Sequence, residues 1–266
     1  MKTDSPRSLS RSQIIPSPRY AASVAGRNAR VFSKLWKGSL APQFIDPLFY
    51  LVAMGYGLGT YIASINGVPY RDFIAPGLIA SSAMWAASFE CTYNVYIRMH
   101  EYHLYDAVLS TPVEAQDLVA GDLVWSAIRA MVYSTVFLVV VTAFGLIHSW
   151  WALAIPPLVI IGGLAFSTIA YTFTALIPRI DLYSYYFTLG ITPMFLFSGI
   201  FFPFNRLPGW VEVVAWFTPL YHLVQVTRGL ADGPGPIVLV HLGILLAISV
   251  ALFAIPVRAV RRRLVA

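Results

Sequence analysis

Charged side chains inside long apolar stretches are the first candidates for chemistry in this sequence. A charge at the centre of a membrane span costs about 2.5–3.5 kcal/mol on insertion scales, so such residues usually face protein or water. Glu90 and Arg129 lie deepest, at similar depth in two stretches. We expect them to form an ion pair, or each to be neutralised separately. Three further carboxylates lie near stretch ends, where hydrated headgroups lower the cost: Asp46, Asp122 and Asp181.

Motifs for nucleotide and metal chemistry are absent from the sequence. It contains no G-x-x-x-x-G-K-[ST] loop and no G-x-G-x-x-G. The run His100-Glu101-Tyr102-His103 resembles H-E-x-x-H, but its histidines are three residues apart instead of four and no third ligand is evident. The five histidines are scattered along the chain. We therefore expect no metal and no cofactor on this chain.

Composition places these residues in a membrane protein. Of 266 residues, 58% are apolar and 11% are charged, whereas soluble domains carry about a quarter charged residues. Aromatic residues reach 15%, which excludes a disordered chain. We predict an all-α integral membrane protein with six spans of about 20 residues or more. They are expected near 44–63, 73–97, 122–147, 151–177, 182–203 and 237–257.

The distribution of Lys and Arg predicts the orientation. The net charge is +6, with eight basic residues in the first 40 and four in the last nine. Basic residues concentrate on the cytoplasmic side of membrane proteins. Both termini are therefore expected in the cytoplasm of a bacterial cell, at its inner membrane. Because the basic residues lie in the tails, we expect contact with membrane lipid and not with nucleic acid.

The N-terminal region divides into a tail and an amphipathic helix. Residues 1–18 are expected to be a disordered cytoplasmic tail, and 19–266 the membrane domain. Over 19–37, apolar residues such as Val24 and Phe32 share one stripe, and basic residues such as Arg27 and Arg30 lie opposite. Such a helix lies in the plane of the membrane interface. It acts as an anchor to anionic lipid, or it also packs against a cytoplasmic partner.

The segment 98–121 is the longest internal cytoplasmic segment. Thr111-Pro112-Val113-Glu114 fits a capping box with Pro at the first helical position. We predict that a helix begins there and continues into the third span, with a separate short helix over Tyr102–Ser110. This helix–break–helix is either a docking element or an ordinary loop.

The segment 199–235 is expected at the outer face. Pro203, Pro208 and Pro219 divide it into pieces too short to span the bilayer, at 209–217 and 220–230. We predict two short helices before the last span, which either dip back into the membrane as a re-entrant hairpin or lie on its outer face. Nearby aromatic residues serve helix packing, or a pathway for a lipid or sugar substrate.

Two stretches carry a resemblance to a known family. YDAVLSTPVEAQDLVAGDLVW (105–125) is similar to the cytoplasmic segment of nodulation-factor (lipo-oligosaccharide) exporter permeases. The outer segment 198–230 contains the L-P, P-L-x-H and R-x-L elements of the same family, at Leu207-Pro208, Pro219 to His222, and Arg228 to Leu230. Over residues 20–260, the order of elements resembles the permease subunit of type-2 ABC exporters, which include drug exporters.

The resemblance implies an ATP-driven exporter of an amphipathic substrate such as a lipo-oligosaccharide, glycolipid or hydrophobic drug. Two copies of a separate ATPase would carry ATP and Mg²⁺, and a second permease copy would complete the pathway. The residues implied in ATPase coupling are Arg98, Glu101, Asp106, Thr111, Pro112, Glu114, Asp117, Arg179 and Asp181. Those of the outer hairpin are Pro208, Trp210, Pro219, His222 and Arg228. An ion-coupled secondary transporter and a membrane-embedded lipid-modifying enzyme are the alternatives.

Overall fold

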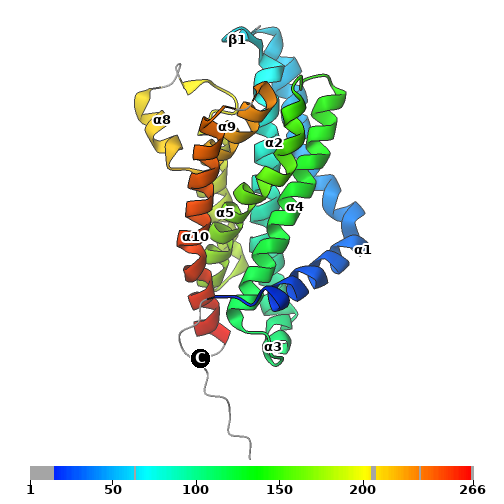
Figure 1. Cartoon of the computed structure of the whole chain (residues 1–266), viewed down its shortest axis with the longest axis vertical. Helices are drawn as coiled ribbons and strands as arrows, with labels where there is room; N and C mark the ends of the chain where they lie inside the picture. The colour runs from blue at the N-terminus through cyan, green and yellow to red at the C-terminus, as the bar shows by residue number, and fades with distance from the viewer. Residues whose placement is uncertain (1–14, 63, 205–207, 234, 265–266) are drawn as a thin grey trace, which may run out of the picture.

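A computed structural model describes residues 15–62, 64–204, 208–233 and 235–264. Its long helices run side by side in one bundle (Figure 1). The expected helical architecture is confirmed, with one small addition. Strands β1 (Ser64–Ile65) and β2 (Val68–Pro69) pair antiparallel at one end of the bundle. Asn66 and Gly67 between them both have positive φ, 51° and 83°, which is the backbone that a two-residue hairpin requires.

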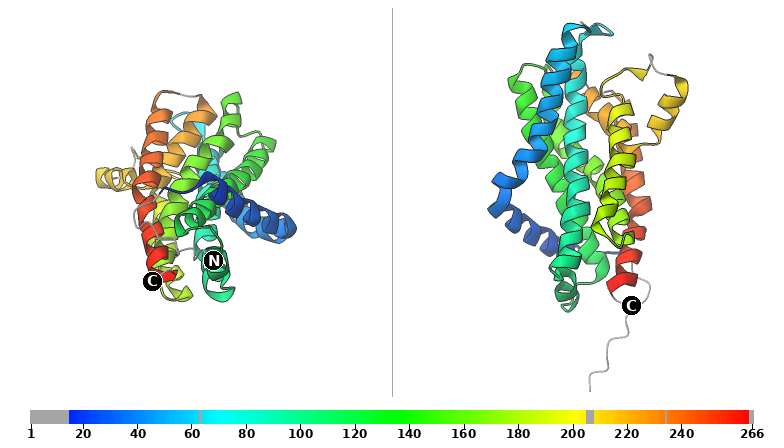
Figure 2. Two further views of the ribbon diagram at one scale, coloured as in Figure 1. Left: turned by 60° about the horizontal axis from the view of Figure 1, so that its bottom comes forward. Right: turned by 180° about the vertical axis from the view of Figure 1, so that it is seen from behind.

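The N-terminal helix is longer than either element expected there. Helix α1 (Pro18–Tyr50) continues into a π-helical segment, η1 (Leu51–Gly57), and a short 3₁₀ turn, η2 (Leu58–Thr60). The predicted interfacial helix and the first predicted span therefore form one helical run. It bends sharply, so that its first part lies across the base of the bundle and its second part climbs the side (Figures 1 and 2).

The second helical run ends at the predicted helix–break–helix. It comprises α2 (Tyr70–Phe89) and two π-helical turns, η3 (Glu90–Asn94) and η4 (Ile97–Glu101). His103 then adopts left-handed backbone, with φ of 46°, and the short helix α3 (Leu104–Leu109) follows. The short helix predicted over 102–110 is thus confirmed.

The predicted start of the next helix is wrong by three residues. Helix α4 (Ala115–Ala143) has Glu114, not Thr111, as its N-cap. The backbone N–H of Thr111 bonds to the carbonyl of Val108, 3.1 Å away, so Thr111 completes the last turn of α3. The capping box is formed one turn later, where Asp117 Oδ2 accepts from the backbone N–H of Glu114 over 3.1 Å.

The second half of the chain holds two long helices and several short ones. After η5 (Trp150–Ala154) comes α5 (Ile155–Leu176). The next run is assembled from four short pieces: η6 (Ile180–Leu182), α6 (Tyr183–Tyr185), η7 (Tyr186–Ile191) and α7 (Thr192–Phe197). The chain finishes with α8 (Gly209–Trp216), α9 (Pro219–Asp232) and α10 (Ile237–Leu264). The two short helices predicted before the last span are therefore present.

One boundary in this half differs from its expected place. The fifth predicted span was expected to continue to residue 203, but its helix ends at Phe197. Gly199 has φ of +82°, a left-handed backbone that ends the helix. Residues 198–203 then connect α7 to the segment before α8 without helical structure.

Three helices of the described residues are long and apolar enough to cross a membrane: Ala115–Ala143, Trp150–Leu176 and Ile237–Arg263. They match the third, fourth and sixth predicted spans. The start of α1, the short helix α3 and the C-terminal end of α10 lie at one end of the bundle, and the β-hairpin and α9 lie at the other (Figure 1). We call these the α3 end and the hairpin end.

Close packing between helices depends on small residues of α4 and α5. A Cβ on Gly121 of α4 would lie 2.5 Å from Cβ of Val24, so α1 can cross here only because this position is glycine. A Cβ on Gly163 of α5 would lie 2.8 Å from that of Ala130. Helix α4 thus occupies the centre, in contact with α1, α2 and α5.

Candidate functional site

Four ionised side chains meet inside the bundle, toward its α3 end. Arg129 of α4 forms an ion pair with Oε2 of Glu90, the first residue of η3. Arg98 donates from Nη1 to Oε1 of the same carboxylate over 2.8 Å, and its Nη2 lies 3.5 Å from Oδ1 of Asp122. The ion pair expected between Glu90 and Arg129 is present. We call these four residues and their hydrogen-bonding partners the buried ion network.

Asp122 gathers hydrogen bonds from three other elements. Its Oδ1 accepts from Nδ2 of Asn28 on α1 over 2.7 Å. Its Oδ2 accepts from the hydroxyl of Tyr105 on α3 and, at 3.4 Å, from that of Tyr171 on α5. The expectation that headgroup hydration lowers the cost of this carboxylate is wrong, because Asp122 is fully buried. Its charge is balanced by protein donors instead.

Glu90 is held at the opposite side of the buried ion network. Nδ2 of Asn94 donates to its Oε2 over 2.6 Å. Arg129 uses its other Nη to donate to the hydroxyl of Tyr133, 3.0 Å away. That hydroxyl donates in turn to the backbone carbonyl of Ser39 in α1, 2.5 Å away. The chain of contacts therefore reaches α1 a second time, eleven residues after Asn28.

The local backbone explains how one helix supplies three members. Glu90, Asn94 and Arg98 follow one another at intervals of four residues, so they share a face of the helical run. The run widens into π-helical turns at Glu90–Asn94 and Ile97–Glu101. Such turns are rare and often occur at functional sites.

The charges of the buried ion network cancel. Two carboxylates face two guanidinium groups, so no net charge is buried. Burial, reinforced by the carboxylate of Asp122, raises the pKa of the Tyr105 phenol well above its usual range. Tyr105 therefore remains a hydrogen-bond donor. A buried pair contributes little net stability over an apolar one, but removal of one partner leaves an uncompensated charge that costs about 3–5 kcal/mol.

A second polar contact lies at the hairpin end, between α9 and α10. Nε2 of His222 lies 2.7 Å from the carbonyl of Trp216 and therefore carries a proton that it donates. Nδ1 of His222 is then the acceptor for Nδ1 of His241, 2.8 Å away. Both histidines are buried. They join the end of α8 to the last helix.

Arg228 also stabilises the hairpin end. One Nη donates to the carbonyls of Gly199, at 3.0 Å, and Phe73, at 3.4 Å. The guanidinium lies over the ring of Phe73, 4.2 Å from its centroid. Arg228 thus binds one carbonyl just after the end of α7 and another within α2.

The remaining residues expected in the outer hairpin differ in exposure. Pro219 begins α9 and is buried, and Pro208 precedes α8. Trp210 on α8 is exposed over 68% of its surface, as a lipid-facing or interfacial residue would be. Depth in a membrane is not defined by these contacts, so the re-entrant arrangement stays a prediction.

Comparison with known proteins shows the family to which the chain belongs. The family described as "ABC-2 type transporter" matches residues 24–231, which is most of the chain. This chain belongs to the ABC-2 type transporter family. The match includes Asn28, Tyr105, Asp122 and Tyr171. The buried ion network therefore lies within the family region of this ABC-2 permease.

Relatives of this ABC-2 chain align over nearly its whole length. Nodulation protein J of Rhizobium meliloti (strain 1021) is 37% identical over 240 residues, which is 90% of this chain and 91% of that protein. Nodulation protein J of Rhizobium leguminosarum bv. viciae is also 37% identical, over 90% of this chain and 92% of the relative. The inner membrane transport permease YadH of Escherichia coli (strain K12) is 24% identical, over 88% of this chain and 91% of that protein.

The residues expected to couple this ABC-2 permease to an ATPase fall into two groups. Most have exposed side chains at the α3 end: Glu101, Asp106, Thr111, Pro112, Glu114, Arg179 and Asp181. Arg98 is only partly exposed and Asp117 is buried, so neither offers a free side chain to a partner, and their role in coupling stays a prediction. Arg98 is used by Glu90 and Asp122, and Asp117 Oδ1 accepts from the backbone N–H of Ser17 over 2.6 Å.

Sequence reasoning missed several members of the buried ion network in this ABC-2 chain. Asn28, Tyr105, Tyr133 and Tyr171 were not singled out, and Asp122 was placed near hydrated headgroups. A signal was available for Asn28, because it is a polar residue close to the apolar stripe of the N-terminal helix. Among the described residues, no group of three or more His, Cys, Asp or Glu side chains is arranged to hold a metal ion.

Proposed function

We propose that this ABC-2 permease is one half of the transmembrane pathway of an ATP-driven exporter in the bacterial cytoplasmic membrane. The contact between Tyr105 and Asp122 carries the proposal. It joins a short helix at the α3 end, exposed at Asp106 and Ala107, to the central helix of the bundle. A force applied to α3 from outside the bundle therefore reaches the membrane helices through a buried hydrogen bond.

The partner is an ABC ATPase, with two copies in each transporter. Its docking surface is the α3 end, where Glu101, Asp106 and Glu114 are exposed, with the Arg179–Asp181 turn beside them. ATP and Mg²⁺ bind to that partner. ATP-driven closure of the two ATPases displaces α3, and Tyr105 transmits the displacement to Asp122. Asn28 transmits it to the N-terminal helix through the same carboxylate.

The permease crosses the membrane six times, with both termini in the cytoplasm. The start of α1 lies at the same end of the bundle as the end of α10. This arrangement agrees with an even number of spans. The residues 1–14 of the proposed cytoplasmic tail lie outside the described residues. A second copy of the chain faces this one, and the pathway forms between the two. The α8–α9 hairpin closes the outer end.

The substrate is amphipathic: a lipo-oligosaccharide, another glycolipid or a hydrophobic drug. The Nodulation protein J relatives favour the first of these, because they align over nine-tenths of this chain. Rings of Trp85, Phe89, Tyr93 and Phe187 stack where α2, η3 and η7 meet, with ring centroids 4.7–5.8 Å apart. These half-buried rings offer flat apolar faces to the sugar rings or acyl chains of a passing substrate.

Reconstitution tests this function. The permease is placed in vesicles with an ABC ATPase that co-purifies with it, and ATP hydrolysis and lipo-oligosaccharide movement are measured together. We expect hydrolysis that the substrate stimulates, and transport that stops when ATP is withheld. Uphill transport by the permease alone, driven by an ion gradient, would identify a secondary transporter and contradict the proposal. Chemical turnover of a lipid by the permease alone would identify an enzyme.

A further inference from the structure

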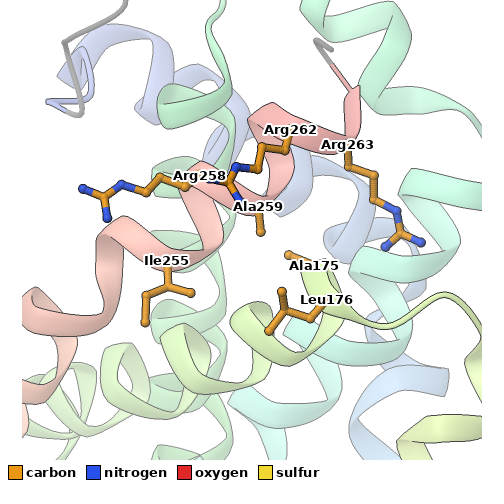
Figure 3. A pocket seen from close by; sticks show the side chains of 7 residues that line it. All are labelled: Ala175, Leu176, Ile255, Arg258, Ala259, Arg262 and Arg263. Atoms are coloured by element: carbon orange, nitrogen blue, oxygen red, sulfur yellow. The ribbon is translucent and has the colours of Figure 1, made fainter.

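A groove opens between α5 and α10 at the α3 end of the bundle. Its volume is about 590 Å³, and Ala175 and Leu176 form one wall. The other wall is the end of α10, with Ile255, Arg258, Arg262 and Arg263. In Figure 3, the three arginines surround the upper part of this groove, and Ile255 and Leu176 lie below them. The groove does not overlap the buried ion network.

Two of the arginines that line the groove, Arg258 and Arg262, lie one helical turn apart and have free guanidinium groups among the described residues. In the described part of the chain, neither Arg258 nor Arg262 has a hydrogen bond or an ion pair, and both are exposed. Arg263 differs, because its Nη1 donates to the carbonyl of Ile177 over 2.8 Å and fixes its side chain across the groove. The groove lining contains no carboxylate among the described residues. The groove therefore carries uncompensated positive charge, which favours the binding of an anion.

The lower part of the groove is apolar and open. Ile255 of α10, one turn before Arg258, is exposed over 40% of its surface, and Leu176 at the end of α5 is exposed over 66%. Helix α10 belongs to a predicted span, so these side chains lie on the membrane side of Arg258. A water-soluble anion or an acidic protein surface would use the arginines but would leave this apolar part uncovered. A ligand with both an anionic group and a hydrocarbon chain covers both.

We propose that the groove binds one anionic phospholipid of the cytoplasmic leaflet. Its phosphate lies between Arg258 and Arg262, which can both donate to it, and an acyl chain covers Ile255 and Leu176. Basic pockets between membrane helices on the cytoplasmic side bind lipid headgroups for the same electrostatic reason. The bound lipid bridges α5 and α10. Its binding does not depend on which substrate the permease moves.

Native mass spectrometry of the purified permease tests the proposal. The protein in detergent is titrated with phosphatidylglycerol or with phosphatidylcholine of the same chains. We expect one phosphatidylglycerol to remain bound under conditions that remove phosphatidylcholine. In the double variant Arg258→Gln/Arg262→Gln, affinity for phosphatidylglycerol falls by about 30-fold, at about 1 kcal/mol for each removed charge. Arg258→Lys/Arg262→Lys retains most of the affinity.

A matched variant controls for charge. Arg19→Gln/Arg30→Gln removes two exposed arginines from α1, outside the groove, and should keep the tightly bound phosphatidylglycerol. Inorganic phosphate distinguishes a headgroup site from a site for a free anion. We expect that inorganic phosphate at the same concentration does not displace the lipid. The variant Ile255→Ser should weaken the binding of phosphatidylglycerol and leave the binding of inorganic phosphate unchanged.

Three results would overturn the proposal. The first is equal retention of phosphatidylcholine and phosphatidylglycerol. The second is unchanged phosphatidylglycerol binding in the Arg258→Gln/Arg262→Gln variant. The third is a variant that keeps the lipid but loses its ABC ATPase during purification, because the groove would then be a protein-docking surface. Loss of transport with lipid binding intact would contradict the function proposed above and leave this lipid site standing.

Discussion

Nδ2 of Asn28 lies 2.7 Å from Oδ1 of Asp122, across 94 residues of sequence. The other oxygen of the same carboxylate accepts from Tyr105. One side chain of α4 therefore holds both the N-terminal helix and the short helix α3. Because α1 and α3 lie at the same end of the bundle, this carboxylate connects both elements to the central helix.

Neutralisation of this carboxylate should destabilise the permease strongly. In Asp122→Asn the shape is kept, but Glu90 is left alone against the guanidinium groups of Arg98 and Arg129. One net positive charge is then buried, at a cost of about 3–5 kcal/mol. We expect a clearly lower melting temperature in detergent, measured by tryptophan fluorescence.

The control for this variant is Asp46→Asn. Asp46 is an exposed carboxylate on α1 without an ion pair among the described residues. Its neutralisation should change stability by no more than about 0.5 kcal/mol. If Asp122→Asn melts at the same temperature as Asp46→Asn, the buried charge balance described here is incorrect.

The two partners of the central ion pair should respond unequally to substitution. Arg129→Gln leaves Glu90 with Arg98 at 2.8 Å and Asn94 at 2.6 Å. Glu90→Gln leaves Arg129 with Tyr133 but with no carboxylate partner. We therefore expect Glu90→Gln to cost more free energy of unfolding than Arg129→Gln.

A double-mutant cycle checks the same pair. The double variant Glu90→Gln/Arg129→Gln restores a neutral interior, with Arg98 facing Asp122. Its cost should be smaller than the sum of the single costs by about 0.5–3 kcal/mol, the range for residues in one network. Strictly additive costs would mean that the two residues do not interact.

Several features of this fold were predictable because they depend on local composition. Apolar length identified the third, fourth and sixth predicted spans, which match long apolar helices. The cost of charge in lipid indicated that Glu90 and Arg129 need each other, and they form an ion pair. The prolines at 208 and 219 marked the short helices of the hairpin segment.

The rest depended on contacts between distant residues. Asn28 of α1, Tyr105 of α3 and Tyr171 of α5 each donate a hydrogen bond to the buried carboxylate of Asp122. No local sequence pattern indicates that these three residues meet. The capping box was misplaced because Thr111 bonds backward into α3. The wide turn at Glu90 has no residue pattern that we recognise, yet it lies where the ion network begins.

The crossing of α1 over α4 should depend on one glycine. In Gly121→Ala the new Cβ would lie 2.5 Å from Cβ of Val24 and 2.7 Å from the carbonyl oxygen of Ala21. Overpacking of this kind costs about 1–3 kcal/mol. The displaced helix would also stretch the hydrogen bond of Asn28. We expect a lower melting temperature and faster proteolysis near the start of α1.

Gly26→Ala is the matched control for this glycine. It lies in α1 with no atom within 4 Å of the position of a new Cβ. Alanine in a helix is better than glycine by about 1 kcal/mol, so this variant should be as stable as the natural chain or more stable. Similar losses in both variants would show that the crossing of α1 over α4 is not closely packed.

The proposed transmission through α3 makes the sharpest functional prediction. Tyr105→Phe removes the hydroxyl that reaches Asp122, while Tyr171 still donates to the same oxygen over 3.4 Å. For a hydrogen bond to a charged group the net loss is about 1.5–3 kcal/mol, which leaves the permease folded but weakens coupling by about tenfold or more. In vesicles with the ABC ATPase, hydrolysis should persist while substrate moved per ATP falls. Tyr102→Phe, an exposed neighbour, should behave as the natural chain does. Wild-type transport per ATP in a folded Tyr105→Phe permease would remove α3 from the coupling path, because the hydroxyl is its only hydrogen bond to Asp122 among the described residues.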